Sequence, residues 1–184
     1  MNDQRFDRTL QLVGQVYVMP DYYEVGREKI RELSRALQND HPAHHREDAA
    51  AELGYRGLVA PATFVSVVGS VALDYLFSYI LVEYEITAVL QTEQKFVIHR
   101  PPVPGDQLVS SLTLQSIRQA AGADIMVVEN HVTADGEDVV TSTTTFITKT
   151  DAEVDPAAVA LVDAVLPAGV PRVGPTARPV PSRT

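Results

Sequence analysis

The chain contains no cysteine, which excludes disulfides and metal sites built from thiolates. Basic residues are also scarce, since 15 Lys and Arg stand against 24 Asp and Glu and leave a formal net charge of −9. Such a charge repels phosphates, so we expect no nucleic-acid partner. The 184 residues are 45% hydrophobic and 21% charged, which is typical of a globular protein with a core of its own.

The chain also lacks an apolar run at its start, because residues 1–14 include several charges and no stretch of the kind that a secretory signal requires. Residues 58–82 are long enough to span a bilayer, but Asp74 and several serines lie within them. A charge at the bilayer centre costs roughly 2.5–3.5 kcal/mol. We therefore expect a buried core helix, no membrane span and a cytoplasmic protein.

The first half of the chain predicts helices. Asp21 and Glu24 have the spacing of a capping box, and the apolar residues after them predict a helix to about Gln38. A short helix over residues 46–53 should end at Gly54. The next predicted helix, from residue 62 to about residue 79, is apolar nearly all round and must therefore be covered by other structure.

The second half predicts long strands, because Val, Ile and Thr are frequent there. Asp135-Gly136 between two of these segments is a strong hairpin signal. The predicted strands are Val16–Val18, Gln94–Arg100, Gln107–Ile117, Asp124–Ala134 and Asp138–Lys149. An apolar helix followed by antiparallel strands indicates an α+β domain whose sheet wraps around the helix.

The last part of the chain has a different composition. Residues 151–184 contain six of the 12 prolines and no aromatic residue. Such a segment has little to bury, so we predict a disordered tail after a single domain of residues 1–150.

A polar loop at residues 38–45 holds Asp40 and the histidines His41, His44 and His45. A carboxylate beside an imidazole can move a proton and position a water, which is the chemistry of adding or removing water. On the residues alone, a structural loop whose Asp and His side chains cap the flanking helices is slightly favoured. Metal binding is a third interpretation, but Pro42 argues against the helix that would bring the three histidines together.

This loop resembles the motif Asp-x-Asn-Pro-aliphatic-His of MaoC-like and R-specific enoyl hydratases. When the motif is laid on Pro42, the histidine falls on His44 and the aspartate falls on Asn39. Asp40 is displaced by one residue, so it would replace the aspartate only in a shifted loop. A second register pairs Asp40 with His45 at the same separation, but it misplaces the proline.

Three further segments extend the resemblance over about residues 13–150. They are residues 21–31, residues 54–64, and residues 94–100 with the turn that follows. All three are similar to (3R)-hydroxyacyl-ACP dehydratase subunits of the HadA and HadC kind. The resemblance implies a single hot-dog fold, with a long central helix wrapped by an antiparallel sheet. It also implies that a HadB-like subunit supplies the catalytic aspartate and histidine, and that no cofactor or metal is needed.

One departure from the family pattern concerns the start of the central helix. Catalytic members have a His-Gly pair there, and a backbone N–H of this pair polarises the thioester carbonyl. Ala60-Pro61 stands at that position here, and proline has no N–H to donate. From the resemblance we expect Asp40 and His44 as catalytic candidates, and Asn39, Pro61 and Phe64 as residues that contact the substrate.

The expected function is therefore a subunit of a (3R)-hydroxyacyl-thioester dehydratase or enoyl hydratase of fatty-acid metabolism. Its substrate would be an acyl-ACP or acyl-CoA thioester, and its partner a HadB-like subunit. Two alternatives stay open. The chain is either a self-sufficient homodimeric R-specific enoyl hydratase that uses Asp40 and His44, or a non-catalytic protein that binds or scaffolds acyl thioesters.

Overall fold

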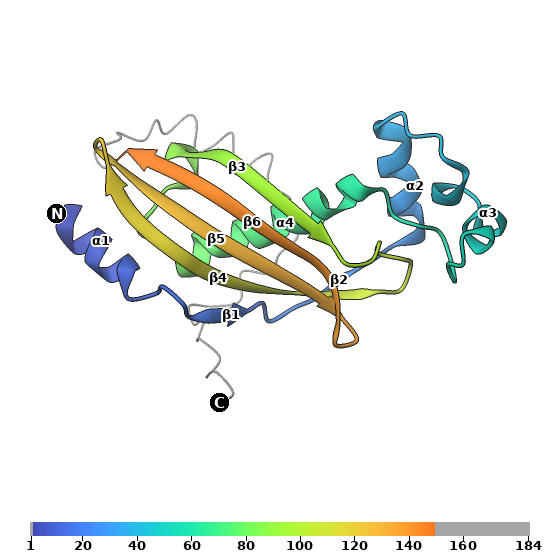
Figure 1. The fold of residues 1–184 in the computed structure, drawn as a ribbon, viewed down its shortest axis with the longest axis horizontal. Helices are drawn as coiled ribbons and strands as arrows, with labels where there is room; N and C mark the ends of the chain where they lie inside the picture. Colours follow the sequence, from blue (N-terminus) through green and yellow to red (C-terminus); the bar gives the residue numbers. More distant parts are fainter. Residues whose placement is uncertain (1, 150–184) are drawn as a thin grey trace.

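The computed structural model describes residues 2–149, with side chains from residue 4 onward. The expected tail, residues 151–184, lies outside the described residues. The main elements in chain order are α1 Asn2–Leu10, β1 Val16–Val18, β2 Tyr23–Glu24, α2 Arg27–Ala36, α3 Glu47–Glu52, α4 Val65–Tyr75, β3 Val89–Ile98, β4 Gln107–Ala120, β5 Ala123–Ala134 and β6 Glu137–Lys149. In Figure 1, α2 and α3 lie beyond one end of the sheet, and α1 lies at the other end.

The strands form one antiparallel sheet in the order β1-β4-β5-β6-β3, and β2 pairs with β4 beside β1. Along β5, buried and half-buried residues alternate without a break, so one face of the sheet is directed into the protein. Asp135 and Gly136 have φ values of 52° and 81°, which suit a two-residue turn with positive φ at both positions. The predicted hairpin is therefore confirmed, as are the strands.

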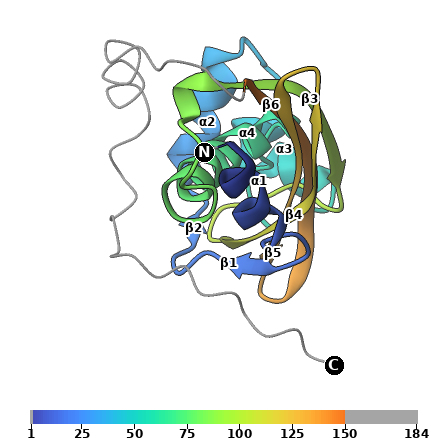
Figure 2. The same cartoon turned by 90° about the vertical axis from the view of Figure 1, so that its left-hand side faces the viewer.

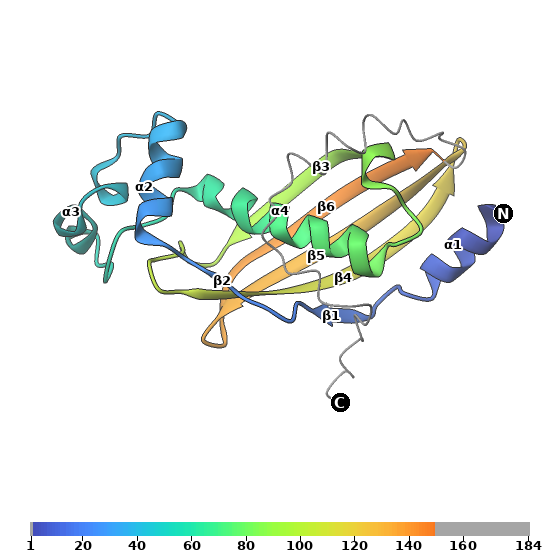
Figure 3. The ribbon, with the colours of Figure 1, turned by 180° about the vertical axis from the view of Figure 1, so that it is seen from behind.

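The predicted central helix is also confirmed. It runs over Ala62–Ile80 as a 3-10 turn, the helix α4 and a final π-helical turn. Figures 2 and 3 show it lying across the inner face of the curved sheet, which gives the α+β hot-dog architecture. Within the described residues, this stretch alone is long and apolar enough to cross a bilayer, and it is packed on the sheet along one side.

The opposite side of the helix is less covered than the sequence predicts. Val65, Val68 and Ala72 are buried, but Ser66 is exposed and Val71 is only half-buried. A long apolar helix is therefore covered by the sheet on one side and left partly open on the other by the part of the chain that the structure describes.

Two details of the N-terminal region differ from the prediction. The capping box is wrong, because Tyr23 and Glu24 form β2 and pair with β4, and α2 starts at Arg27 with no side-chain cap. Edge pairing beside β4 therefore takes the residues that would otherwise have started the helix. In addition, α1 was not predicted from the sequence. An ion pair of 2.9 Å between Arg5 and Asp124 links this helix to the sheet.

The core between the sheet and α4 has two apolar clusters. The first, which we call the loop-end cluster, includes Phe64 and Val68 from the helix and Val132 and Val140 from the sheet. The second, the far cluster, continues toward the other end of the sheet. Its principal members are Leu76, Leu81, Leu112, Leu114, Met126, Val128 and Phe146.

Candidate active site

The histidine loop is held against α2 by backbone and side-chain hydrogen bonds. Gln38 turns the chain out of α2 with a φ of 55°, and the Asn39 amide then donates to the carbonyl of the buried Ser34 at 2.8 Å. The Arg31 guanidinium donates twice to the His45 carbonyl, at 3.1 and 2.9 Å. The loop is therefore a fixed structure in which side chains have defined directions.

His44 makes two hydrogen bonds through its ring. Nδ1 lies 2.6 Å from the Val59 carbonyl oxygen, and Nε2 lies 3.2 Å from the side-chain nitrogen of Asn39. A carbonyl oxygen only accepts, so Nδ1 carries the hydrogen and the Asn39 amide donates to Nε2. The lone pair of Nε2 is thus directed at the Asn39 amide, and the His44 side chain is half-exposed to solvent.

The structure brings Asn39 and His44 together, but not Asp40 and His44. Asp40 is exposed, and within the described residues no hydrogen bond joins it to a histidine. The second register, which pairs Asp40 with His45, is not formed either, because the His45 Nε2 contacts the Asn39 carbonyl at 2.9 Å. The register with asparagine at the aspartate position is therefore the one that the fold uses. A catalytic role of Asp40 stays a prediction.

The three histidines do not converge on a common point. His41 accepts a hydrogen bond from the Ala43 amide through Nδ1 and so begins the 3-10 turn Pro42–His44, while His44 and His45 contact Val59 and Asn39. Within residues 2–149 no group of three His, Cys, Asp or Glu side chains could hold a metal ion. The three imidazoles therefore do not form a common site in this loop.

Pro61 and Phe64 form the corner that leads into the central helix. Pro61 is buried and its carbonyl accepts from the Phe64 amide at 2.8 Å, while the Ala60 amide donates to the Pro102 carbonyl at 2.9 Å. At this corner, therefore, neither Ala60 nor Pro61 offers a free N–H to a ligand. Phe64 is fully buried and meets Tyr23 edge-on at 6.0 Å, so it serves the core here. Substrate contact by either residue stays a prediction.

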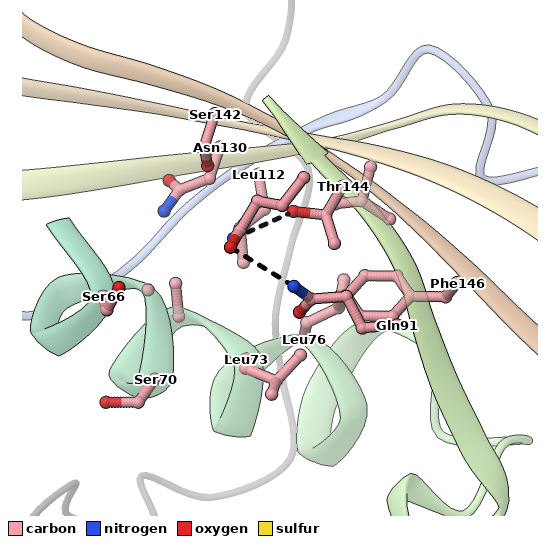
Figure 4. Close-up of a pocket in the computed structure, with 14 residues that line it drawn as sticks. Ser66, Ser70, Leu73, Leu76, Gln91, Leu112, Asn130, Ser142, Thr144 and Phe146 are labelled. Atoms are coloured by element: carbon pink, nitrogen blue, oxygen red, sulfur yellow. Dashed lines mark hydrogen bonds between the residues drawn. The ribbon is translucent and has the colours of Figure 1, made fainter. Parts of the chain in front are cut away.

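A cavity of about 200 Å³ lies between α4 and the inner face of the sheet. Figure 4 shows it from the side, with α4 below and the strands above. Its apolar wall is made by Ala72, Leu73, Leu76, Leu112, Val128 and Phe146. Its polar wall is made by Ser66, Ser70, Gln91, Gln94, Asn130, Ser142 and Thr144.

The sequence analysis missed this cavity, although one signal for it was present. Polar residues stand at inward positions of β5 and β6 that the alternation assigns to the core, namely Asn130, Ser142 and Thr144. A polar residue at a core position marks a place where packing is interrupted or a ligand binds.

Comparison with known families and proteins gives a consistent result. The family model described as "FAS1-like, dehydratase domain region" matches residues 11–142. Among curated proteins, UPF0336 protein ML1908 of Mycobacterium leprae is 44% identical over 136 residues, which are 73% of this chain and 81% of that protein. UPF0336 protein Rv0637 of Mycobacterium tuberculosis is 43% identical over the same shares of the two chains.

Solved structures agree in fold. A chain of the C-terminally truncated HadBC (3R-hydroxyacyl-ACP dehydratase) complex of Mycobacterium tuberculosis is 40% identical, with a TM-score of 0.64 over 74% of this chain and 96% of that one. A MaoC-like dehydratase is 39% identical, with a TM-score of 0.74 over 95% of this chain but only 53% of that one. The (R)-hydratase of A. caviae, at 14% identity and a TM-score of 0.59, shares the fold.

Proposed function

The chain belongs to the family of FAS1-like dehydratase domain regions, and on that premise we propose that it is the accessory subunit of a (3R)-hydroxyacyl-thioester dehydratase. Membership of this family supports a lyase-type activity in general. The finer proposal is that a HadB-like partner supplies the catalytic aspartate and histidine. This chain then supplies the wall of the acyl-binding cavity and half of the interface.

The observation that carries the proposal is the hydrogen bond between Asn39 and His44. Dehydration of a 3-hydroxyacyl thioester to the trans-2-enoyl form requires a base at C2 and an acid at the leaving hydroxyl. The Asn39 amide carries no charge and cannot take a proton at neutral pH, and its N–H occupies the free nitrogen of His44. With Pro61 in place of an N–H donor, two parts of the family's catalytic set are missing.

The edge strand β3 supports a partner subunit. It pairs only with β6 within the described residues, and its other edge faces solvent with Leu90, Val97 and Ile98 at 65%, 44% and 42% exposure. Exposed edges that carry large apolar side chains favour pairing with another strand. The partly open side of α4 lies next to this edge in Figure 3, so a second hot-dog subunit would cover both.

The lengths of the similar structures support the same arrangement. The HadBC chain that resembles this one belongs to a complex of two kinds of subunit. The MaoC-like dehydratase extends for about half its length beyond the part that this chain matches. In both proteins the matching part is thus accompanied by further protein, as a separate chain in one and as further sequence in the other.

The cavity suits the acyl chain of the substrate. One end is apolar, with Leu73, Leu76 and Phe146, and the space lies between the helix and the sheet. Its volume of about 200 Å³ is below the roughly 300–1,000 Å³ of pockets that bury drug-sized ligands. A partner on the open side would deepen it.

The test is an assay of enoyl-thioester hydration, followed by loss of the enoyl chromophore. The full chain is purified alone, with a HadB-type subunit, and mixed with that subunit after separate purification. We expect turnover only when both subunits are present. Turnover by the chain alone, abolished by Asp40→Asn, would support the self-sufficient hydratase instead. Acyl-CoA binding without turnover in any mixture would support the scaffold.

Variants of the loop refine this test within the complex. His44→Ala should lower turnover only a few-fold, because His44 is not the catalytic acid or base in this proposal. Loss of an essential acid or base costs on the order of 10²-fold or more. The exposed His99→Ala is the matched control. A loss of 10²-fold or more for His44→Ala, with assembly intact, would assign the chemistry to this loop.

A further inference from the structure

One side of the central helix carries polar residues that the sheet does not cover. Ser66, Ser70, Asp74 and Ser78 recur at every fourth position and so follow one another along the helix surface. Asp74 comes about half a turn after Ala72, a buried residue of the far cluster, and therefore points away from the sheet. Asp74 is half-buried. We call these four residues the helix row.

Asp74 is a charge without a partner in the part of the chain that the structure describes. It takes part in no hydrogen bond or ion pair there, whereas the buried Asp106 and Asp124 each pair with an arginine. No other charged residue occurs in the stretch Ala62–Ile80. Water on the partly open side of the helix therefore stabilises the Asp74 carboxylate in the separate subunit.

The neighbouring edge strand β3 adds no charge on the same side. Its inward positions stand opposite inward residues of β6 and are occupied by Gln91, Gln94, Phe96 and Ile98. The charged residues Glu93 and Lys95 stand opposite half-buried threonines of β6 and so lie on the outer face of the sheet. The surface that the partly open side of α4 shares with the inner side of β3 thus holds a single charge, on Asp74.

A subunit that covers this surface removes water from the Asp74 carboxylate. A buried carboxylate without a compensating cation is costly, so the covering subunit must supply one. In a symmetric pair of identical chains, each copy meets the same surface of the other. That surface offers a second Asp74 carboxylate and no basic residue from the helix or from the inner side of β3. The charge therefore disfavours a pair of two copies.

We propose that Asp74 forms an ion pair with a basic side chain of the covering subunit, and that this pair selects a different subunit over a second copy of this chain. The proposal rests on the proposed function, because it assumes that a second hot-dog subunit covers α4 and β3. Arginine suits the position best, since its guanidinium can bind a carboxylate through two parallel hydrogen bonds. Asp74 then determines partner choice and takes no part in the chemistry.

The first measurement is the Kd between the full chain and a purified HadB-type subunit, by titration calorimetry. Asp74→Asn keeps the shape and removes the charge, so Kd should rise about tenfold or more. Asp74→Ser is a second neutral variant that matches its neighbours in the helix row and should give a similar loss. The matched control is Glu129→Gln, since Glu129 is a half-buried carboxylate on the outer face of β5 and should leave Kd unchanged.

Salt separates loss of an ion pair from loss of packing. Raising the salt from about 0.1 to about 1 M shortens the screening length from about 10 to about 3 Å. Binding of the wild type should therefore weaken more steeply with salt than binding of Asp74→Asn. The second measurement is self-association of the chain alone, by analytical ultracentrifugation. Asp74→Asn should self-associate more tightly than the wild type, because two like charges no longer meet.

The possible outcomes separate the inference from the proposed function. An unchanged Kd for Asp74→Asn, an equal loss for Glu129→Gln, or the same salt dependence for Asp74→Asn and the wild type would overturn the inference alone. Self-association that is weaker in Asp74→Asn than in the wild type would also overturn it. If the wild type does not bind the HadB-type subunit at all, the proposed function fails as well.

Discussion

Buried polar groups at the two ends of the sheet have complete sets of hydrogen-bond partners, whereas a buried polar group in its middle does not. At one end, the buried Asp106 accepts hydrogen bonds from Arg56 and Arg100 at 2.8 and 2.7 Å and from the Val103 amide at 2.9 Å. At the other end, the buried Asp124 has an equally complete set of partners. These are Arg5 at 2.9 Å, the Tyr84 hydroxyl at 3.0 Å and Gln119 at 2.9 Å.

In the middle, Asn130 has no such set. Its buried oxygen lacks a partner among the described residues, although the residue is only 7% exposed and the two aspartates are 0% exposed. The comparison teaches that burial alone does not reveal the role of a polar residue. A complete set of partners indicates a residue that stabilises the fold, whereas a buried oxygen without a partner marks a place where the packing is interrupted.

The largest expected effect is at Asp106. Asp106→Ala leaves two arginines and the Val103 amide without their acceptor, so the free energy of unfolding should fall by about 4 kcal/mol. Urea unfolding followed by circular dichroism measures it. Asp138→Ala is the matched control, since Asp138 is exposed and pairs only with His131, and it should change stability by less than about 0.5 kcal/mol. Similar values for the two variants would break the comparison.

The next effect is at Asp124, where Asp124→Ala should cost about 3 kcal/mol. Because the ion pair between Arg5 and Asp124 is removed, α1 should also detach from the sheet before the rest of the domain unfolds. Hydrogen exchange read along the chain should show faster exchange in α1 than in β5. Glu83→Ala, which removes the exposed partner of Arg8, is the control and should leave α1 protected. Unchanged exchange in α1 would show that other contacts hold it.

An alkaline pH tests the same end of the sheet through Tyr84. Burial raises the pKa of Tyr84 from 10.0 to about 12. The unfolded chain loses this proton near pH 10 and the folded chain near pH 12. The contribution of Tyr84 to the free energy of unfolding is therefore intact below pH 10 and is lost as the pH rises to 12. The loss is about 2 kcal/mol. Tyr84→Phe should be less stable at pH 8 and should fall less steeply between pH 10 and pH 12. Parallel curves of stability against pH for the wild type and Tyr84→Phe would contradict this prediction.

The smallest expected effect is in the middle of the sheet and has the opposite sign. Asn130→Leu removes a buried oxygen without a partner and keeps the same branched shape, and the adjacent cavity has room for the larger methyl groups, so stability should be unchanged or rise by up to about 1 kcal/mol. Thermal unfolding of the full chain measures it. A loss of more than about 2 kcal/mol would show that the amide has a structural partner, and the contrast between the ends and the middle would no longer hold.

Local patterns in the sequence predicted most of the fold. The alternation in residues 107–149, the Asp-Gly turn and the apolar stretch from Ala62 are each set by neighbours in the chain, and each was confirmed. The capping box at Asp21 failed for a physical reason, because β2 competes for the same residues by pairing with β4. Helix α1 was missed since its attachment is an ion pair to Asp124, a residue distant in sequence.

The sequence by itself determined the α+β class, the hairpins, the central helix and a loop with one well-placed histidine. It left the register of that loop open, and only the tertiary structure decided it, by bringing Asn39 and not Asp40 to His44 while Val59 held the other ring nitrogen. It also left the cavity unseen. Backbone patterns depend on short-range preferences, whereas a hydrogen-bond partner, or the lack of one at Asn130, depends on which distant strands and helices meet.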